Sequence, residues 1–273
     1  DPQRRILRQP QVDAEGLVSR DEALDPLDIR AELAQHAVGL CRRTAELLAA
    51  LSRDVARTKE LFEAAGERHA VARVQARLAE AEWDLGRIED GLERMNRSFE
   101  LLSSEEPDAD VAMLAAQLGR FLFFNGQPEL ALQRVESALE MAEGLLLPDV
   151  VAQALTTKGV VLLSRHRRTE GIALLRFAIE TALEHDKPST ALRASFNLAD
   201  SLGQVNRFAE GAETVRAGLA QARRVGNRYW EISFLGQLYP FLALGEWDEA
   251  LAMAAQLPID EWAPYSRITR PGS

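Results

Sequence analysis

The chain has 273 residues, of which 47% are hydrophobic, 27% are charged and only 6% are aromatic, and its formal net charge is −10. This acidic balance argues against a nucleic-acid-binding surface, which needs a basic footprint. The single cysteine excludes an internal disulfide and a cysteine-ligated zinc site, and it fits a reducing cytoplasm. No apolar run approaches the roughly 18 residues that a transmembrane helix requires.

Two features concern the origin of the chain. Only three of its 32 basic residues are lysine, which is typical of a GC-rich bacterial genome because arginine codons are rich in G and C. The chain also begins at Asp1 rather than at a methionine, so we expect it to be a piece of a longer protein.

Residues 1–27 carry no repeat, and prolines punctuate them, so they are predicted to be a lead-in or linker. From residue 28 to about residue 66 apolar residues recur at helical spacing, but no glycine turn divides this segment. We interpret it as a degenerate first repeat, because terminal repeats are often atypical.

A repeated phrase organises the chain from there to about residue 257. Its clearest copy runs from Leu118 to Leu132, with the turn at Asn125-Gly126 between two helical patterns. The turn positions are 86, 126, 166, 206 and 245, so the steps are 40, 40, 40 and 39 residues. A fixed period of this size predicts an α-solenoid.

Each period contains two stretches with apolar residues at the i, i+3, i+4, i+7 spacing of an amphipathic helix, separated by glycine, proline and serine breakers. We therefore expect an all-α fold built of antiparallel helix pairs. The predicted repeat units are about 28–66, 67–106, 107–146, 147–186, 187–226 and 227–257, followed by an irregular tail at 258–273.

Small residues recur at one phase of the period. They stand five residues after each turn position and seven residues before four of them: Gly91, Ala131, Gly171, Gly211, Ala250, Ala79, Gly119, Gly159 and Ala199. Glycine inside a helix costs about 0.5–1 kcal/mol relative to alanine. We therefore expect the two helices of each pair to cross at these residues with no room for a side chain.

The last unit departs from the pattern. Pro240 stands inside its expected first helix and should kink or delay that helix. Its second helix, from Glu246 to about Gln256, stops early, and no polar capping helix follows. Either the tail covers this end or the natural protein continues with more repeats, and we favour the second; an uncapped apolar end could also pair two copies end to end.

These phases resemble the tetratricopeptide repeat family over about residues 68–256. The residues that carry the resemblance are the pairs Leu78-Ala79, Leu118-Gly119 and Leu198-Ala199, the turns Gly86 and Gly126, and Ala131, Ala138, Ala178 and Ala250. The period of about 40 exceeds the family's 34, so the helices should be longer. The resemblance implies an all-α, right-handed α-solenoid that binds along the concave face formed by its first helices.

The long, Ala/Arg/Leu-rich variant of the repeat looks like the sensor arms of bacterial multidomain signalling ATPases and transcriptional regulators. The phrases 193–200 and 244–251 carry this likeness. It implies a cytoplasmic module that recognises a protein, a peptide or a small effector and controls an attached ATPase or output domain. The alternative is a standalone adaptor or scaffold that mediates protein–protein assembly.

No motif for catalysis, phosphate binding or metal binding is present in the sequence. The four histidines are scattered, with no pair at i, i+4 spacing. We therefore predict no enzymatic activity, no cofactor, no metal, no direct contact with nucleic acid and no membrane insertion.

By resemblance of phase, the first helices place a set of side chains on the concave face. The predicted partner-binding residues are Arg73, Glu80, Trp83, Met113, Arg120, Phe123, Gln153, Thr156, Arg193, Phe196 and Asp200, with Trp230 or Tyr239 as additions. This mixture suits a peptide or helix with apolar anchors and a carboxylate. The alternative for the aromatic residues is that they belong to the core, and Arg120 and Arg193 could simply pair with Glu80 or Asp200.

Overall fold

The computed structural model describes only part of the chain. The described residues are 11–12, 18–19, 64, 66–84, 86–103 and 106–257. Most of the predicted first unit, the predicted tail at 258–273, and Cys41 lie outside them.

The chain divides into two compact units, Asp1–Leu47 and Leu48–Ser273. In the first unit, β1 (Gln11–Val12) and β2 (Val18–Ser19) form a short antiparallel pair in which Val12 lies opposite Val18. The second unit holds all the described helices.

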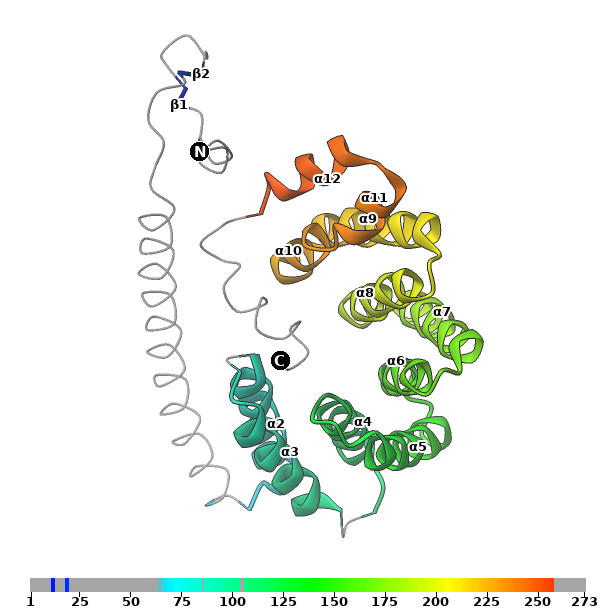
Figure 1. Cartoon of the computed structure of the whole chain (residues 1–273). Helices are drawn as coiled ribbons and strands as arrows, with labels where there is room; N and C mark the ends of the chain where they lie inside the picture. Colours follow the sequence, from blue (N-terminus) through cyan, green and yellow to red (C-terminus); the bar gives the residue numbers. More distant parts are fainter. Residues whose placement is uncertain are drawn as a thin grey trace. The chain divides into compact units, whose positions relative to one another are not determined.

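Antiparallel helix pairs build the second unit (Figure 1). The first helices of four regular pairs are α2 (Arg68–Asp84), α4 (Ala109–Phe124), α6 (Pro148–Ser164) and α8 (Pro188–Gln204). Their partners are α3 (Ile88–Leu102), α5 (Pro128–Gly144), α7 (Arg168–Glu184) and α9 (Phe208–Arg224). The predicted α-solenoid of helix pairs is thus confirmed. Among the described helices, none is long and apolar enough to cross a bilayer.

The five predicted turn positions share one backbone geometry. Each residue there has a positive φ, between 59° at Asn206 and 78° at Gly86. At the second turn, the N–H of Gly126 donates to the Phe123 carbonyl at 3.0 Å and the N–H of Gln127 donates to the Leu122 carbonyl at 2.9 Å. This pair of bonds ends a helix in the Schellman motif. The repeated motif turns the chain back by the same amount each time, so residues 40 apart become neighbours.

The helices of a pair cross at the recurring small residues, as predicted. A Cβ added at Gly91 would lie 2.8 Å from the Ala79 carbonyl oxygen, and one at Gly171 would lie 2.6 Å from the Gly159 oxygen. The prediction is wrong at Gly211, where the nearest atom, Pro240 Cγ, is 3.5 Å away. A Cβ there would make only ordinary contacts, with Pro240 and with the Ala199 carbonyl oxygen at 3.6 Å, because α8 lies farther from this glycine than α6 lies from Gly171.

The fifth pair is interrupted where Pro240 predicts it. Its first half is split into α10 (Arg228–Leu235) and α11 (Tyr239–Leu244), and its second half is the short α12 (Trp247–Ala254). Pro240 occupies the first turn of α11, where a missing N–H breaks no helical hydrogen bond. Residues 236–238 therefore run between two helices without belonging to either.

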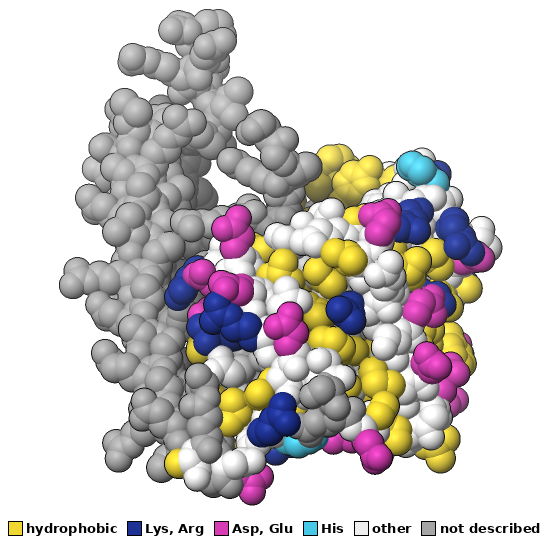
Figure 2. Space-filling view, turned by 90° about the horizontal axis from the view of Figure 1, so that it is seen from below, with side chains coloured by type: hydrophobic (Ala, Val, Ile, Leu, Met, Phe, Trp, Pro, Cys, Tyr) yellow, Lys and Arg dark blue, Asp and Glu magenta, His cyan; other side chains and the backbone are white. Residues whose placement is uncertain are grey.

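The first helices of successive pairs also contact one another. Helix α4 packs on α6, α6 on α8, and α8 on α10. In Figure 1 these helices form the inner row of the second unit, and α5 and α7 lie outside them. The buried core is rich in alanine and leucine and runs from α2 into α8. On the face seen in Figure 2, acidic and basic side chains intermingle with apolar ones instead of separating by sign.

Candidate functional site

The first helices enclose a cavity of about 780 Å³, called the groove cavity below. Its lining residues come from α2, α4, α6, α8, α10 and α11, from the turn after α8, and from the segment between α10 and α11; α3, α5, α7 and α9 contribute none of them. The volume falls within the range of roughly 300–1,000 Å³ that is usual for small-ligand sites. The cavity thus gathers side chains from most of the second unit.

The repeat period explains why distant residues meet there. Arg120 Nη2 donates to Glu80 Oε1 at 3.2 Å, and these residues are 40 positions apart. Gln237 Nε2 donates to the Phe196 carbonyl oxygen at 3.1 Å across 41 positions. Equivalent turns of neighbouring first helices therefore lie side by side, and polar residues at those turns bond across the groove.

Many of the residues predicted for the concave face do line this cavity. They are Trp83, Arg120, Thr156, Arg193, Phe196 and Asp200, together with the suggested additions Trp230 and Tyr239. These residues span five helix pairs, so the phase of the repeat predicted their convergence.

Aromatic rings form much of the apolar wall. The Phe196 ring centroid lies 5.7 Å from that of Trp230 and 5.9 Å from that of Phe234. Between α2 and α4, the Trp83 ring centroid lies 4.5 Å from that of Phe121. Trp83 is only 9% exposed, so it belongs to the core and also presents an edge to the cavity. The two interpretations of this residue are therefore compatible.

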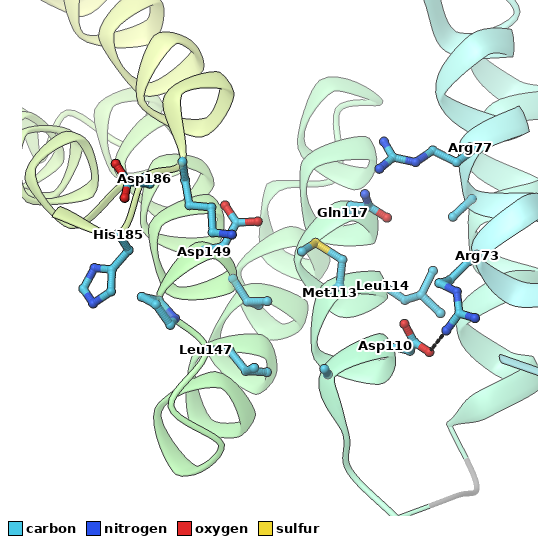
Figure 3. A pocket seen from close by; sticks show the side chains of 15 residues that line it. Arg73, Arg77, Asp110, Met113, Leu114, Gln117, Leu147, Asp149, His185 and Asp186 are labelled. Atoms are coloured by element: carbon cyan, nitrogen blue, oxygen red, sulfur yellow. Dashed lines mark hydrogen bonds and ion pairs between the residues drawn. The ribbon is translucent and has the colours of Figure 1, made fainter. Parts of the chain in front are cut away.

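Arg73 and Met113 lie elsewhere. They line a second cavity of about 620 Å³ between α2, α4, the start of α6 and the turn before α8 (Figure 3). Figure 3 shows the Arg73 guanidinium paired with Asp110, while Arg77 on the same wall pairs with Glu80 at 3.0 Å. The charges on that wall are matched within the protein.

The remaining predicted residues line neither cavity. Glu80 accepts from Arg120, and Gln153 donates to Asp149 Oδ2 at 3.2 Å. Phe123 lines neither cavity and packs its ring 5.1 Å from that of Phe124. It is Phe124, one position further along α4, that reaches the groove cavity.

Two charged groups in the groove cavity are strongly affected by their surroundings. Burial, reinforced by the positive charge of Arg120, lowers the pKa of Arg193 to about 9, so the guanidinium remains cationic at neutral pH. Burial also raises the pKa of Asp200, and a hydrogen bond from Gln204 opposes that shift. The Asp200 side chain is open to the cavity, yet the surrounding walls exclude much of its solvent. The site therefore holds one buried cation, Arg193, that is influenced by the charge of a second, Arg120.

The hydroxyl groups of the cavity wall are engaged by their own helices. Thr156 Oγ1 donates to the Ala152 carbonyl at 2.7 Å, and Ser233 Oγ donates to the Tyr229 carbonyl at 2.8 Å. Neither hydroxyl is bonded to a histidine or a carboxylate, which a nucleophile would need as its base.

His69, Asp108 and Asp110 place one ligand atom each within 4.8 Å of one another, the one such group within the part of the chain that the structure describes. His69 Nδ1 lies 3.1 Å from Asp110 Oδ2 and 3.3 Å from Asp108 Oδ2. Asp110 also pairs with Arg73, and Asp108 accepts the Val111 N–H at 2.9 Å as the N-cap of α4. These contacts give the cluster a structural role in joining α2 to α4.

Comparison with known proteins supports the repeat architecture. Residues 70–144 match the family model described as tetratricopeptide repeat. No curated protein matches the chain. The second unit is thus a tetratricopeptide-like helical repeat, with the family model covering its first two described pairs.

Several solved structures share the fold at low sequence identity. BtubC (BKLC) from P. vanneervenii is 13% identical, with a TM-score of 0.58 over 84% of this chain and 94% of that one. Aspartyl phosphate phosphatase F from Bacillus subtilis is 15% identical, with a TM-score of 0.59 over 84% of this chain and 61% of that one. A Rap protein complexed with Competence and Sporulation Factor is 14% identical, with a TM-score of 0.61 over 82% and 72%. At these identities the likeness concerns the fold alone.

Proposed function

We propose that the chain is a non-catalytic recognition module that holds a peptide, a helix or a small effector in the groove cavity. The observation that carries the proposal is the cavity itself, which is lined by first helices from five successive pairs and walled by aromatic rings. Sites of this kind combine apolar walls with a few placed polar groups, as Arg120, Arg193 and Gln237 are placed here. The Rap protein, which has been solved in complex with Competence and Sporulation Factor, supports the same use of a related fold.

We further propose that the module is one cytoplasmic arm of a larger bacterial signalling or transcription regulator. Binding in the groove would then restrain or release an attached ATPase or output domain. The proposal rests on the likeness of residues 193–200 and 244–251 to such sensor arms, and the alternative is a standalone adaptor. The mass of the native polypeptide in its source cells, measured by blotting, separates the two. A band at the mass of this chain alone would support the adaptor and contradict the arm.

The groove is tested by replacing Trp230 with alanine. Trp230 lines the groove cavity, and removing a central aromatic anchor typically costs at least about 2 kcal/mol of binding free energy. We expect partner proteins captured from the source cells by the wild-type chain to be lost, or held roughly thirtyfold more weakly, by the variant.

The matched control is Trp247→Ala. Trp247 is 59% exposed on α12 and lies outside the groove cavity. The Trp247→Ala variant should capture the same partner proteins as the wild-type chain. Circular dichroism should show the same helicity in both variants. Equal capture by wild type and Trp230→Ala would place the binding surface elsewhere and contradict the proposal.

Self-association is a second proposal and concerns the last helices. Large apolar side chains are exposed there, including Tyr239 at 60%, Trp247 at 59% and Leu251 at 67%. Exposed apolar patches mark interaction surfaces, and we propose that two copies pair end to end through this one. Analytical ultracentrifugation should show a monomer–dimer equilibrium that Leu251→Glu shifts to monomer. A single monomeric species at all concentrations would rule out this pairing.

A further inference from the structure

Three buried polar atoms in the described part of the chain lack a hydrogen-bond partner. They are Arg120 Nε, Arg193 Nε and Gln237 Oε1, and all three residues line the groove cavity. Because more than about 90% of buried polar groups in proteins are hydrogen-bonded, each such atom calls for an explanation. Their convergence on one cavity suggests a single explanation, which is a ligand that supplies all three partners.

The two arginines call for an anion. Arg120 has one hydrogen bond to Glu80, at a long 3.2 Å, and its guanidinium lies 5.2 Å from the centre of the Phe121 ring. Within the described residues Arg193 forms no ion pair, and the positive charge of Arg120 disfavours its protonated form. An oxyanion placed between the two guanidinium groups would relieve their repulsion and accept from both Nε atoms.

The acidic groups nearby do not fill this role. Glu80 bonds Arg120, Gln117 and Arg77 rather than Arg193, and Asp149 accepts from Thr190 and Gln153. Asp200 accepts from Gln204 at 2.7 Å and stands seven residues beyond Arg193 on α8, which is about 10 Å along the helix axis. Among the described residues none of these carboxylates forms an ion pair with Arg193, so its positive charge has no direct partner.

Gln237 calls for a donor. Its Nε2 donates to the Phe196 carbonyl oxygen, which fixes the amide orientation and leaves Oε1 as the buried acceptor. Gln237 belongs to the segment between α10 and α11. The break in the fifth pair therefore brings its side-chain amide to the groove cavity. Phe196 lies one turn from Arg193 on α8, and its ring and the Trp230 ring, 5.7 Å apart, belong to the same cavity wall.

Resting on the proposed function, we propose that the groove cavity recognises a three-part chemical group. An oxyanion, carboxylate or phosphate, lies between Arg120 and Arg193. An apolar or aromatic part packs against Phe196 and Trp230. An N–H or O–H donor reaches Gln237 Oε1. The group can belong to an acidic peptide or to a free small acid, since the recognising chemistry is the same.

Small probes test this chemistry directly by calorimetry or ligand-observed NMR. N-acetylphenylalanine carries all three parts, its methyl ester lacks the anion, and 3-phenylpropionate lacks the N–H donor. Because hydrogen bonds to charged groups contribute more than neutral ones, we expect the ester to bind at least about tenfold more weakly, and 3-phenylpropionate about fivefold more weakly.

Variants assign each preference to its residues. Arg120→Gln and Arg193→Gln should each abolish the preference for the acid over its ester, and Gln237→Met should abolish the preference for the N–H donor. Arg176→Gln is the matched control, because Arg176 is exposed and pairs with Glu210 at 2.6 Å outside the cavity. It should keep both preferences, and Arg193→Lys should restore part of the first by retaining the charge. Unchanged circular dichroism confirms that the variants fold.

A second set of probes distinguishes a peptide C-terminus, an acidic side chain and a phosphate as the source of the anion. A short peptide ending in phenylalanine is compared with its C-terminal amide, with an amidated peptide containing glutamate, and with phenyl phosphate. Binding by any of the anionic probes that depends on both arginines supports the proposal and identifies the source. Equal binding of N-acetylphenylalanine and its ester, equal loss in Arg176→Gln, or no binding of any probe at millimolar concentration would overturn it. Partner capture that depends on Trp230 would then still stand, so the two proposals fail separately.

Discussion

Replacing Arg94 with alanine is expected to lower the free energy of unfolding by about 3–5 kcal/mol, nearer the lower value. Arg94 Nε donates to Glu82 Oε2 at 2.7 Å and Nη2 donates to Oε1 at 2.8 Å, while Nη1 reaches Gln75 Oε1 at 2.8 Å. The Glu82 side chain is only 2% exposed, so the substitution leaves a buried carboxylate without its main partner. Arg87, whose Nη2 is 3.8 Å from Glu82, compensates in part.

Chemical denaturation followed by circular dichroism measures the loss. Arg97→Ala is the matched control on the same helix, because Arg97 is 71% exposed and pairs with the similarly exposed Glu93 one turn away, so its loss should stay within about 0.5 kcal/mol. Because repeats interact mainly with their neighbours, hydrogen exchange should speed up in α2 and α3 and change little in α7. Equal effects of the two substitutions would show that the buried pair does not stabilise the fold.

The Glu82–Arg94 pair was missed in the sequence, although the repeat carries a sign of it. The positions 40, 80 and 120 residues after Glu82 are Leu122, Leu162 and Leu202, each buried to within 5% exposure. A carboxylate at a position that other repeats fill with a core leucine is expected to be buried. It therefore needs a cation beside it, because an unpaired buried charge is costly. Aligning the repeats would have located the carboxylate, but its partner lies on the adjacent helix and is fixed by packing.

The fold was predictable because the same sequence pattern recurs about every 40 residues and gives the same helices and turns each time. Backbone geometry at the turns is the same even where His166 or Asn206 replaces glycine, since the flanking helices impose it. The interruption near Pro240 was also predictable from the missing N–H. Where the interrupted chain then goes was not, because residues 236–238 follow neither helical nor strand periodicity.

The candidate site was predictable only where the helical phase holds. Residues such as Arg120 and Arg193 follow from that phase, since equivalent turns stack across the groove. Phe124 reaches the cavity instead of Phe123 because one position rotates a side chain by about 100°, given 3.6 residues per turn. Gln237 lies outside any helix, so no periodic pattern could place its amide oxygen beside the groove.

Gly171→Ala is expected to lower the free energy of unfolding by roughly 1–2 kcal/mol, although alanine is the better helix former. The added Cβ would lie 2.6 Å from both the Gly159 carbonyl oxygen and Leu163 Cγ, so the backbones of α6 and α7 must separate. Overpacking of this kind typically costs about 1–3 kcal/mol, which the helical preference of alanine offsets by about 0.5–1 kcal/mol.

Gly211→Ala is the matched test at the equivalent position of the next pair. Its Cβ would meet Pro240 Cγ at 3.5 Å and the Ala199 carbonyl oxygen at 3.6 Å, which are ordinary contacts. Only the helical preference then remains, so this variant should be unchanged or stabilised by up to about 1 kcal/mol. Opposite signs in the two denaturation midpoints would show that glycine is required by close helix crossing in α6–α7 and not by the repeat as such. Equal destabilisation would mean that α8 and α9 approach as closely as α6 and α7, contrary to the packing described above.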